Sequence, residues 1–206
     1  MLMKILISLI VSLSVSWVGV TPSVSAGEPI EYVQSLLGKV TAVLDDHAIA
    51  NKEERKQKSD TIKKLIAEYF DIKTMAHDSL GETWNNISSE ERQKFTVIFS
   101  DLFQDSYTGL VLNFLKKEEL EFLGESMTEE NPTVQTLIRR ADDEILVTYF
   151  LKKEHERLAI VDVDIDGVRI VHNYREEFGK EIKRNSFASL MQKMETRRKA
   201  LTAENS

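Results

Sequence analysis

The sequence predicts a single α+β domain, in which helices from both ends of the chain pack on a twisted antiparallel sheet of about four strands. Three observations predict this class. Apolar residues recur at helical spacing in the first half of the chain and again near its end. Between these parts, strand-like apolar runs alternate with polar turns. Finally, no Pro-, Gly- or Ser-rich linker and no internal repeat divides the chain, so we expect one hydrophobic core.

Six stretches have the apolar spacing of a helix face. Each stretch places apolar residues three or four positions apart. The third stretch ends at Gly81, a common helix stop, and the fourth begins with the capping-box pair Ser88 and Glu91. The predicted helical segments are residues 30–44, 62–70, 72–80 and 88–117 before the sheet, and 174–182 and 187–194 after it.

Four runs between these helices have strand character: residues 119–126, 133–140, 145–151 and 158–165. The third run is apolar on both faces, which is typical of a central strand or of one that borders a cavity. In the fourth, strict alternation predicts that Asp162 and Asp164 face solvent while the neighbouring Val and Ile side chains are buried. Asp166-Gly167 is either a tight hairpin turn or the break before the next helix.

The composition excludes several classes of protein. The 206 residues are 42% apolar and 30% charged, with no Cys and a net charge of −7. A chain of this length can bury one ordinary core. The lack of Cys excludes a disulfide scaffold, a thiol nucleophile and a cysteine metal site. The acidic balance disfavours nucleic-acid binding, because neutralising phosphates needs a concentration of cations.

The first 26 residues have the order of regions found in a secretory signal peptide. Lys4 precedes an uncharged, mostly apolar run, residues 5–20, and Ala26 lies at a small-residue cleavage position before Gly27. The rival interpretation is a retained membrane anchor. The apolar run is shorter than the roughly 20 residues needed to span a bilayer. We therefore expect residues 1–26 to be removed and residues 27–206 to form a mature domain in an exported compartment.

Catalytic and metal-binding patterns are missing from the sequence. The 8 Gly are too scattered for a phosphate-binding loop, and no G-x-S-x-G, S-x-x-K or H-E-x-x-H pattern occurs. Asp45-Asp46-His47 comes closest to a metal cluster, and a solvated helix end is the preferred interpretation. We therefore expect that the protein is not an enzyme and holds no metal or cofactor.

Ordered segments through most of residues 27–206 carry a family resemblance. They include residues 69–76 (YFDIKTMA), 80–84, 89–95, 162–168 (DVDIDGV), 173–175 (NYR) and 186–187. Together they resemble the MlaC, or toluene-tolerance, family of exported lipid-binding proteins. No single segment is decisive, but their order and spacing are fairly specific.

The resemblance implies a soluble periplasmic carrier that holds the acyl chains of a phospholipid in an apolar cavity between the sheet and the helices. Its implied partners are phospholipid, an inner-membrane ABC transporter with its substrate-binding domain protein, and an outer-membrane lipoprotein complex. Such carriers serve outer-membrane lipid asymmetry and solvent tolerance. The resemblance implies no cofactor and no nucleic acid, and the bound phospholipid is cargo.

The resemblance also points to residues that would line this cavity. The candidates are Phe70 and Met75 at a helix junction, Phe99, Phe103, Tyr107 and Leu110 on the long helix, and Val147, Tyr149, Val161, Val163 and Tyr174 from the sheet and the helix after it. No residue is assigned to the lipid head group. Arg139, Arg140 and Arg175 are the cations to test for that role.

Two departures from the family pattern bear on the ligand more than on the fold. An aliphatic stretch, residues 158–161, precedes Asp162 where the family commonly has an aromatic residue, and Arg169 stands at the position of a Ser. The family pattern also favours a helix that starts near Arg169, which argues against a hairpin at Asp166-Gly167.

Three alternatives to a phospholipid carrier remain at this point. A hopanoid-associated carrier would keep the fold and change the cargo. An adaptor of an ABC transporter would have a filled core and carry no lipid. An enzyme would need a pocket with converging polar groups and perturbed pKa values. The identity of any bound lipid separates the first two from the phospholipid carrier.

Overall fold

The computed structural model describes residues 27–44, 51–114, 119–127, 131–139, 143–154 and 157–204. Within these ranges helices come first, then strands, then helices, as predicted. The helices are α1 (Glu28–Leu44), α2 (Lys52–Tyr69), α3 (Ile72–Leu80), α4 (Thr83–Asn86), α5 (Ser89–Phe114), α6 (Ile170–Arg184) and α7 (Phe187–Glu204). The predicted signal peptide and the Asp45-Asp46-His47 segment lie outside the described residues.

The strands form one antiparallel sheet in the order β1-β2-β3-β4-β5. Four of them match the predicted strands: β1 (Glu119–Met127), β2 (Pro132–Arg139), β3 (Glu144–Glu154) and β4 (Arg157–Ile165). The fifth, β5 (Val168–Arg169), adds a two-residue strand at one edge. β3 is the middle strand of the sheet, in agreement with the apolar character of both its faces.

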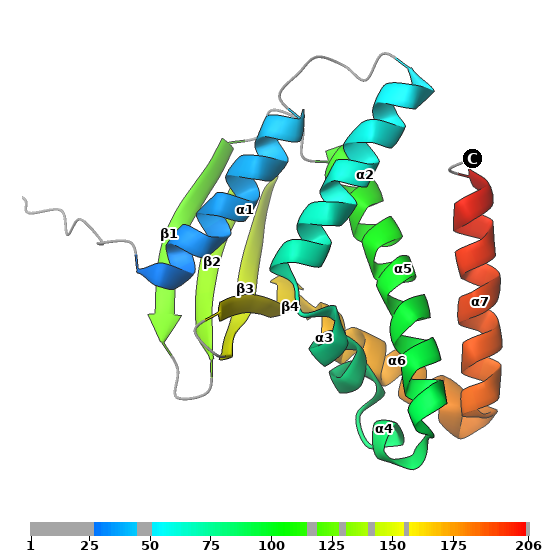
Figure 1. Ribbon diagram of the computed structural model, residues 1–206. Coiled ribbons are helices and arrows are strands. Elements are labelled where there is room, and N and C mark those ends of the chain that lie inside the picture. The colour runs from blue at the N-terminus through cyan, green and yellow to red at the C-terminus, as the bar shows by residue number, and fades with distance from the viewer. Residues whose placement is uncertain are drawn as a thin grey trace, which may run out of the picture.

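The helices are arranged in sequence across the molecule (Figure 1). α1 crosses β1 and β2, and α2, α5 and α7 follow one another away from the sheet. At the amino end of α1, the amide of Ile30 donates a hydrogen bond of 3.2 Å to the Glu125 carboxylate on β1. α5 packs against both α2 and α7, so it has the sheet and α2 on one side and α7 on the other.

The connection between α2 and α3 attaches the helices to the sheet. Phe70, directly after α2, forms a parallel β-bridge with Ile160 on β4. Asp71 then donates its backbone N–H to the Ile160 carbonyl at 2.9 Å. The Asp71 carboxylate caps α3 by accepting from the Thr74 amide at 3.0 Å. The segment that carries the family resemblance is therefore also the one that positions α3 against β4.

Asp166 and Gly167 form a tight hairpin turn, so the expectation against a hairpin is wrong. Their φ angles are 51° and 83°, the left-handed values that a two-residue type I′ turn requires and that an Asp-Gly pair adopts readily. β5 pairs back with the end of β4. The helix nevertheless begins close to the expected position, at Ile170. The hairpin and the following helix therefore both occur, because β5 is only two residues long and α6 begins directly after it.

A bulge at Val161 breaks the expected alternation of β4. Phe150 on β3 pairs with Asp162, but the adjacent Leu151 pairs with Ile160, which leaves Val161 as the extra residue. Ile160 therefore takes the fully buried position, with 0% of its surface exposed, and Val161 is half-buried. The apolar periodicity of the sequence gives no sign of this one-residue shift in the pairing of β3 with β4.

Asp162 is buried, which corrects the prediction that both aspartates of β4 face solvent. Only 5% of its surface is exposed, because α6 begins directly over it. Its Oδ1 accepts from the amides of Val163 at 2.8 Å and Val171 at 3.0 Å, and its Oδ2 accepts from the Arg169 guanidinium at 3.0 Å. The carboxylate thus satisfies an otherwise unpaired N–H of the first turn of α6. Asp164 is half-buried.

Candidate functional site

One face of the sheet is apolar and directed at the helices. The strand register places Val134 opposite Tyr149, Thr136 opposite Val147, and Tyr149 opposite Val163. Residues that are directly opposite in neighbouring strands share a face. All five are at most 7% exposed, so the centre of the sheet presents a continuous, mainly apolar surface.

Aromatic rings form a ladder along one side of α5. Phe95, Phe99, Phe103 and Tyr107 recur every four residues, which places them on one side of the helix. Successive ring centroids lie 5.9, 6.0 and 4.4 Å apart. At the middle of this aromatic ladder, Phe103 lies 5.8 Å from Phe70. The ladder thus connects the helix–helix junction with the interior.

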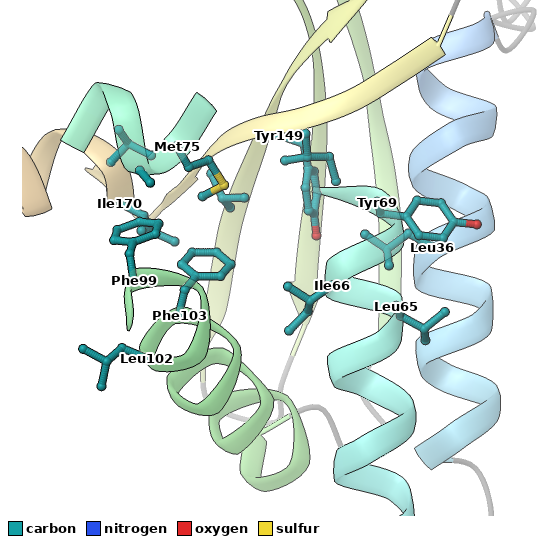
Figure 2. Close-up of a cluster of buried hydrophobic side chains, with 14 of the residues drawn as sticks. Leu36, Leu65, Ile66, Tyr69, Met75, Phe99, Leu102, Phe103, Tyr149 and Ile170 are labelled. Atoms are coloured by element: carbon teal, nitrogen blue, oxygen red, sulfur yellow. The ribbon is translucent and has the colours of Figure 1, made fainter. Parts of the chain in front are cut away.

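Side chains from three elements converge on the same interior region (Figure 2). Phe103 from α5, Ile66 from α2 and Tyr149 from β3 point toward one another. Their exposed fractions are 2%, 6% and 7%. Such a region, bounded by aliphatic and aromatic side chains, is suited to apolar groups.

The side chains of Tyr149, Thr136 and Thr108, each of which carries a hydroxyl group, are buried. Burial raises the pKa of Tyr149 to about 12, and the neighbouring Thr136 hydroxyl opposes that shift. The hydroxyls of Thr136 on β2 and Thr108 on α5 are buried and make no hydrogen bond of ordinary geometry with any described residue. Buried hydroxyls are normally hydrogen-bonded. These groups are therefore places where a water molecule or a ligand oxygen would fit.

A separate pocket of about 490 Å³ lies between α5, α6 and α7. Phe99, Leu102 and Tyr107 of α5 line it, together with residues of both C-terminal helices. Tyr174 of α6 is one of these, and its ring is 5.4 Å from that of Phe99. Burial raises the pKa of both Tyr107 and Tyr174, and an interaction between the two hydroxyls raises it further for Tyr107.

The structure gathers most of the predicted lining residues. Phe70, Met75, Phe99, Phe103, Val147, Tyr149 and Val163 belong to one hydrophobic core or pack against it. Tyr107 and Tyr174 are half-buried at its edge and also line the 490 Å³ pocket. Two residues are placed differently. Leu110 is 45% exposed, and Val161 is the extra residue of the bulge.

The three cations selected for the head group do not converge on one place. Arg139 on β2 pairs with Glu121 at 2.8 Å and with Glu144. Arg175 on α6 donates from Nε to the Asp78 carbonyl at 2.6 Å, so it connects α6 to α3. Arg140 lies outside the described residues. Arg139 and Arg175 therefore have structural partners on the protein itself.

Some residues of the interior were missing from the predicted lining. Ile66 and Leu65 lie on the apolar face of α2, where the helical spacing alone gave no reason to separate lining from ordinary core. Thr136 was also missed, although alternation in its strand places it on the same face as Val134. Around the second pocket, Leu190 and Met194 had been predicted only as one face of the final helix.

None of the helices in the described ranges combines the length and the apolar character needed to cross a membrane. Within the same ranges, no group of three or more His, Cys, Asp or Glu side chains is placed to hold a metal ion.

The family model described as MlaC protein matches residues 34–196. The chain belongs to the MlaC family. The matched region includes every strand of the sheet, the α5 aromatic ladder and most of the helical layer. The family resemblance found in the sequence is thereby confirmed.

The fold is shared with a solved structure of similar size. This is the phospholipid-binding protein from Ralstonia solanacearum, determined in complex with a phospholipid. It aligns with a TM-score of 0.72 at 19% sequence identity, over 85% of this chain and 99% of that chain. At this identity the likeness establishes the MlaC α+β fold. Among curated proteins, none matches the chain.

Proposed function

We propose that this protein binds phospholipid and encloses the acyl chains between the sheet and the helices α2 and α5. The observation that carries the proposal is the MlaC match over residues 34–196. The fold shared with a protein that was solved with a bound phospholipid supports it. The apolar inner face of the sheet and the aromatic ladder of α5 supply the chemistry that acyl chains require.

The energetic reason for enclosing the chains is large. Each buried methylene group is worth roughly 0.8 kcal/mol, so an acyl chain of about 16 carbons costs on the order of 12 kcal/mol to hold in water. A carrier must therefore offer an apolar lining to the tails, while the head group can stay near solvent. This task needs no nucleophile, acid–base pair or metal, and we propose that no catalytic step takes place.

We further propose that the protein acts in the periplasm, after removal of residues 1–26. There it would move phospholipid between an outer-membrane lipoprotein complex and an inner-membrane ABC transporter with its substrate-binding domain protein. The support for this route is membership of the MlaC family. The physical requirement for the route is an exported chain that holds lipid without spanning a membrane.

Native mass spectrometry of the protein, purified without detergent from its exported compartment, tests the proposal. Stoichiometric phospholipid in the complex, identified after extraction, is the expected result. A polycyclic lipid in its place would assign the protein to hopanoid transport. A clean apo mass that persists after incubation with phospholipid vesicles would contradict lipid carriage and favour an adaptor of the transporter.

A further inference from the structure

The pocket between α5, α6 and α7 is separate from the interior that faces the sheet. No residue of β1 to β4 lines it among the described residues. Phe99 and Tyr107 contribute to its wall, whereas Phe103, which lies between them on the aromatic ladder, does not. Figure 1 shows α7 on the side of α5 away from α2 and the sheet. The α5 helix therefore separates this pocket from the buried side chains of the sheet-facing interior.

The inner surface of this pocket is apolar. Leu102, Phe178, Leu190 and Met194 line it from three helices, and each is at most 8% exposed. Met194 suits a wall that adapts to a flexible chain, because its unbranched side chain repacks easily. The surface therefore favours a hydrocarbon.

The volume fits one acyl chain. About 490 Å³ corresponds to the volume of roughly 16 water molecules at about 30 Å³ each. A methylene group occupies slightly less space than a water molecule, so the pocket holds a chain of palmitoyl length but not two such chains.

Four charged side chains lie at the rim of the pocket: Lys193, Glu181, Arg197 and Glu177. The first two form an ion pair with each other. Lys193 and Glu181 neutralise each other through a 2.5 Å ion pair. Glu181 also accepts from Ser189 at 2.8 Å and from Asn185 at 2.9 Å. These three donors, Lys193 first, lower the pKa of Glu181 to about 2, so its carboxylate is already committed.

Arg197 and Glu177 are the remaining charges of the rim. Arg197 lies one helical turn beyond Lys193 and makes no hydrogen bond or ion pair with any described residue. Glu177 accepts only a long hydrogen bond, 3.4 Å, from Asn173 among the described residues. Both residues line the same pocket as Tyr174.

From these observations we propose that the α5–α6–α7 pocket binds a single-chain zwitterionic amphiphile, of the lysophospholipid class. The acyl chain lies against Leu102, Leu190 and Met194. The phosphate is held by Arg197, and the ammonium group of the head is held by Glu177. The hydroxyls of Tyr107 and Tyr174, which interact with each other, line the same pocket and can donate to the glycerol oxygens. This site is additional to the phospholipid site between the sheet and the helices.

Native mass spectrometry during titration with 1-palmitoyl-lysophosphatidylethanolamine tests the proposal. The protein is used as purified, with any co-purified lipid in place. We expect one added lysophospholipid per protein while the original lipid is retained. One-for-one displacement of the original lipid would overturn the proposal, because both ligands would then share one site. If the protein is purified without lipid, a variant that fills only this pocket separates the two sites, so failure of the proposed function and failure of this inference remain distinguishable.

Variants locate the added ligand. Leu190→Trp fills the pocket and is expected to abolish the added mass, and Gln192→Trp, on the exposed side of the same helix, is the matched control. If Leu190→Trp does not fold, Ser106→Leu on α5 fills the pocket from the opposite wall. Binding that is unchanged in a folded pocket-filling variant would overturn the proposal.

Head-group recognition has its own test. Arg197→Gln is expected to weaken the lysophospholipid about tenfold, which corresponds to the loss of one charge-assisted contact. Affinity for uncharged palmitoylglycerol should stay the same in this variant. Equal losses for the two ligands, or no loss for either, would overturn the assignment of the phosphate to Arg197.

Discussion

Phe70 and Ile160 form a bridge between the end of α2 and β4, and Asp71 continues it with a 2.9 Å hydrogen bond to the Ile160 carbonyl. This bridge lies directly before the bulge at Val161. It fixes the α2–α3 junction at the point where β4 changes its alternation, so Phe70 is held against Phe103 of the aromatic ladder. The position of Phe70 in the wall of the interior thus depends on the strand next to the bulge in β4.

The first prediction concerns Val147, which is 5% exposed on the inner face of β3. Val147→Glu places a charge against the proposed acyl chains, and it should speed the loss of bound phospholipid about tenfold or more. Lipid retention in a vesicle-exchange assay measures the effect. Leu146→Glu is the control, because Leu146 is 37% exposed on the opposite face of the same strand. Unchanged retention in a folded Val147→Glu protein would remove Val147 from the lining.

The second prediction concerns the buried carboxylate of Asp162. Asp162→Ala removes the acceptor of two backbone amides and of Arg169, and it should lower the free energy of unfolding by about 2–3 kcal/mol. Arg169→Ala should cost less than about 1 kcal/mol, because the Arg169 side chain is 48% exposed and the backbone amides keep their acceptor. Urea denaturation of both variants provides the comparison. Equal losses would mean that the ion pair, rather than the capping of α6, stabilises this corner.

The third prediction uses two glycines of opposite character. Gly167 has φ of 83° in the β4–β5 turn, so Gly167→Ala should destabilise the protein by about 1 kcal/mol. Gly179 lies inside α6, and an added Cβ there meets no atom within 4 Å. Gly179→Ala should therefore stabilise the protein by up to about 1 kcal/mol. Thermal unfolding measures both, and a stable Gly167→Ala protein would argue against the left-handed turn.

The fourth prediction is a pH dependence that originates at Tyr149. Its pKa is raised from 10.0 to about 12 in the folded protein, so the folded state keeps a proton that the unfolded chain loses first. The stabilising contribution is complete below pH 10 and is lost progressively as the pH rises to about 12. Tyr149→Phe should show a shallower decline of stability over this interval. The other tyrosines are present in both proteins, so parallel declines would exclude Tyr149 as the source.

The helices and long strands could be predicted because each depends on periodicity within a short segment. The buried faces of α2, α5 and β3 follow directly from residue spacing. The burial of Asp162 could not be predicted in this way, because it results from a one-residue shift between β3 and β4 and from the start of α6 over that position. The hairpin at Gly167 was wrongly excluded because the family pattern indicated the following helix and gave no sign of a two-residue strand before it.

The candidate site was predictable in composition more than in shape. The family resemblance pointed to Phe99, Phe103 and Tyr107 on α5, and the structure brings their rings together in one ladder. The resemblance could not indicate which side of the helix faces the sheet at each turn, and Leu110 accordingly emerges exposed. The second pocket depends on how α7 packs against α5. These helices are far apart in the sequence: Arg198 donates a hydrogen bond to Asp101, which lies 97 positions before it.

The order of strands in the sheet has a consequence for folding. Every strand pairs only with the strand beside it in the chain, so the sheet can grow hairpin by hairpin through local contacts, which form quickly. α1 differs, because its hydrogen bond from Ile30 to Glu125 joins residues 95 positions apart. α1 can therefore dock on the sheet only after strands that are synthesised long after it have formed.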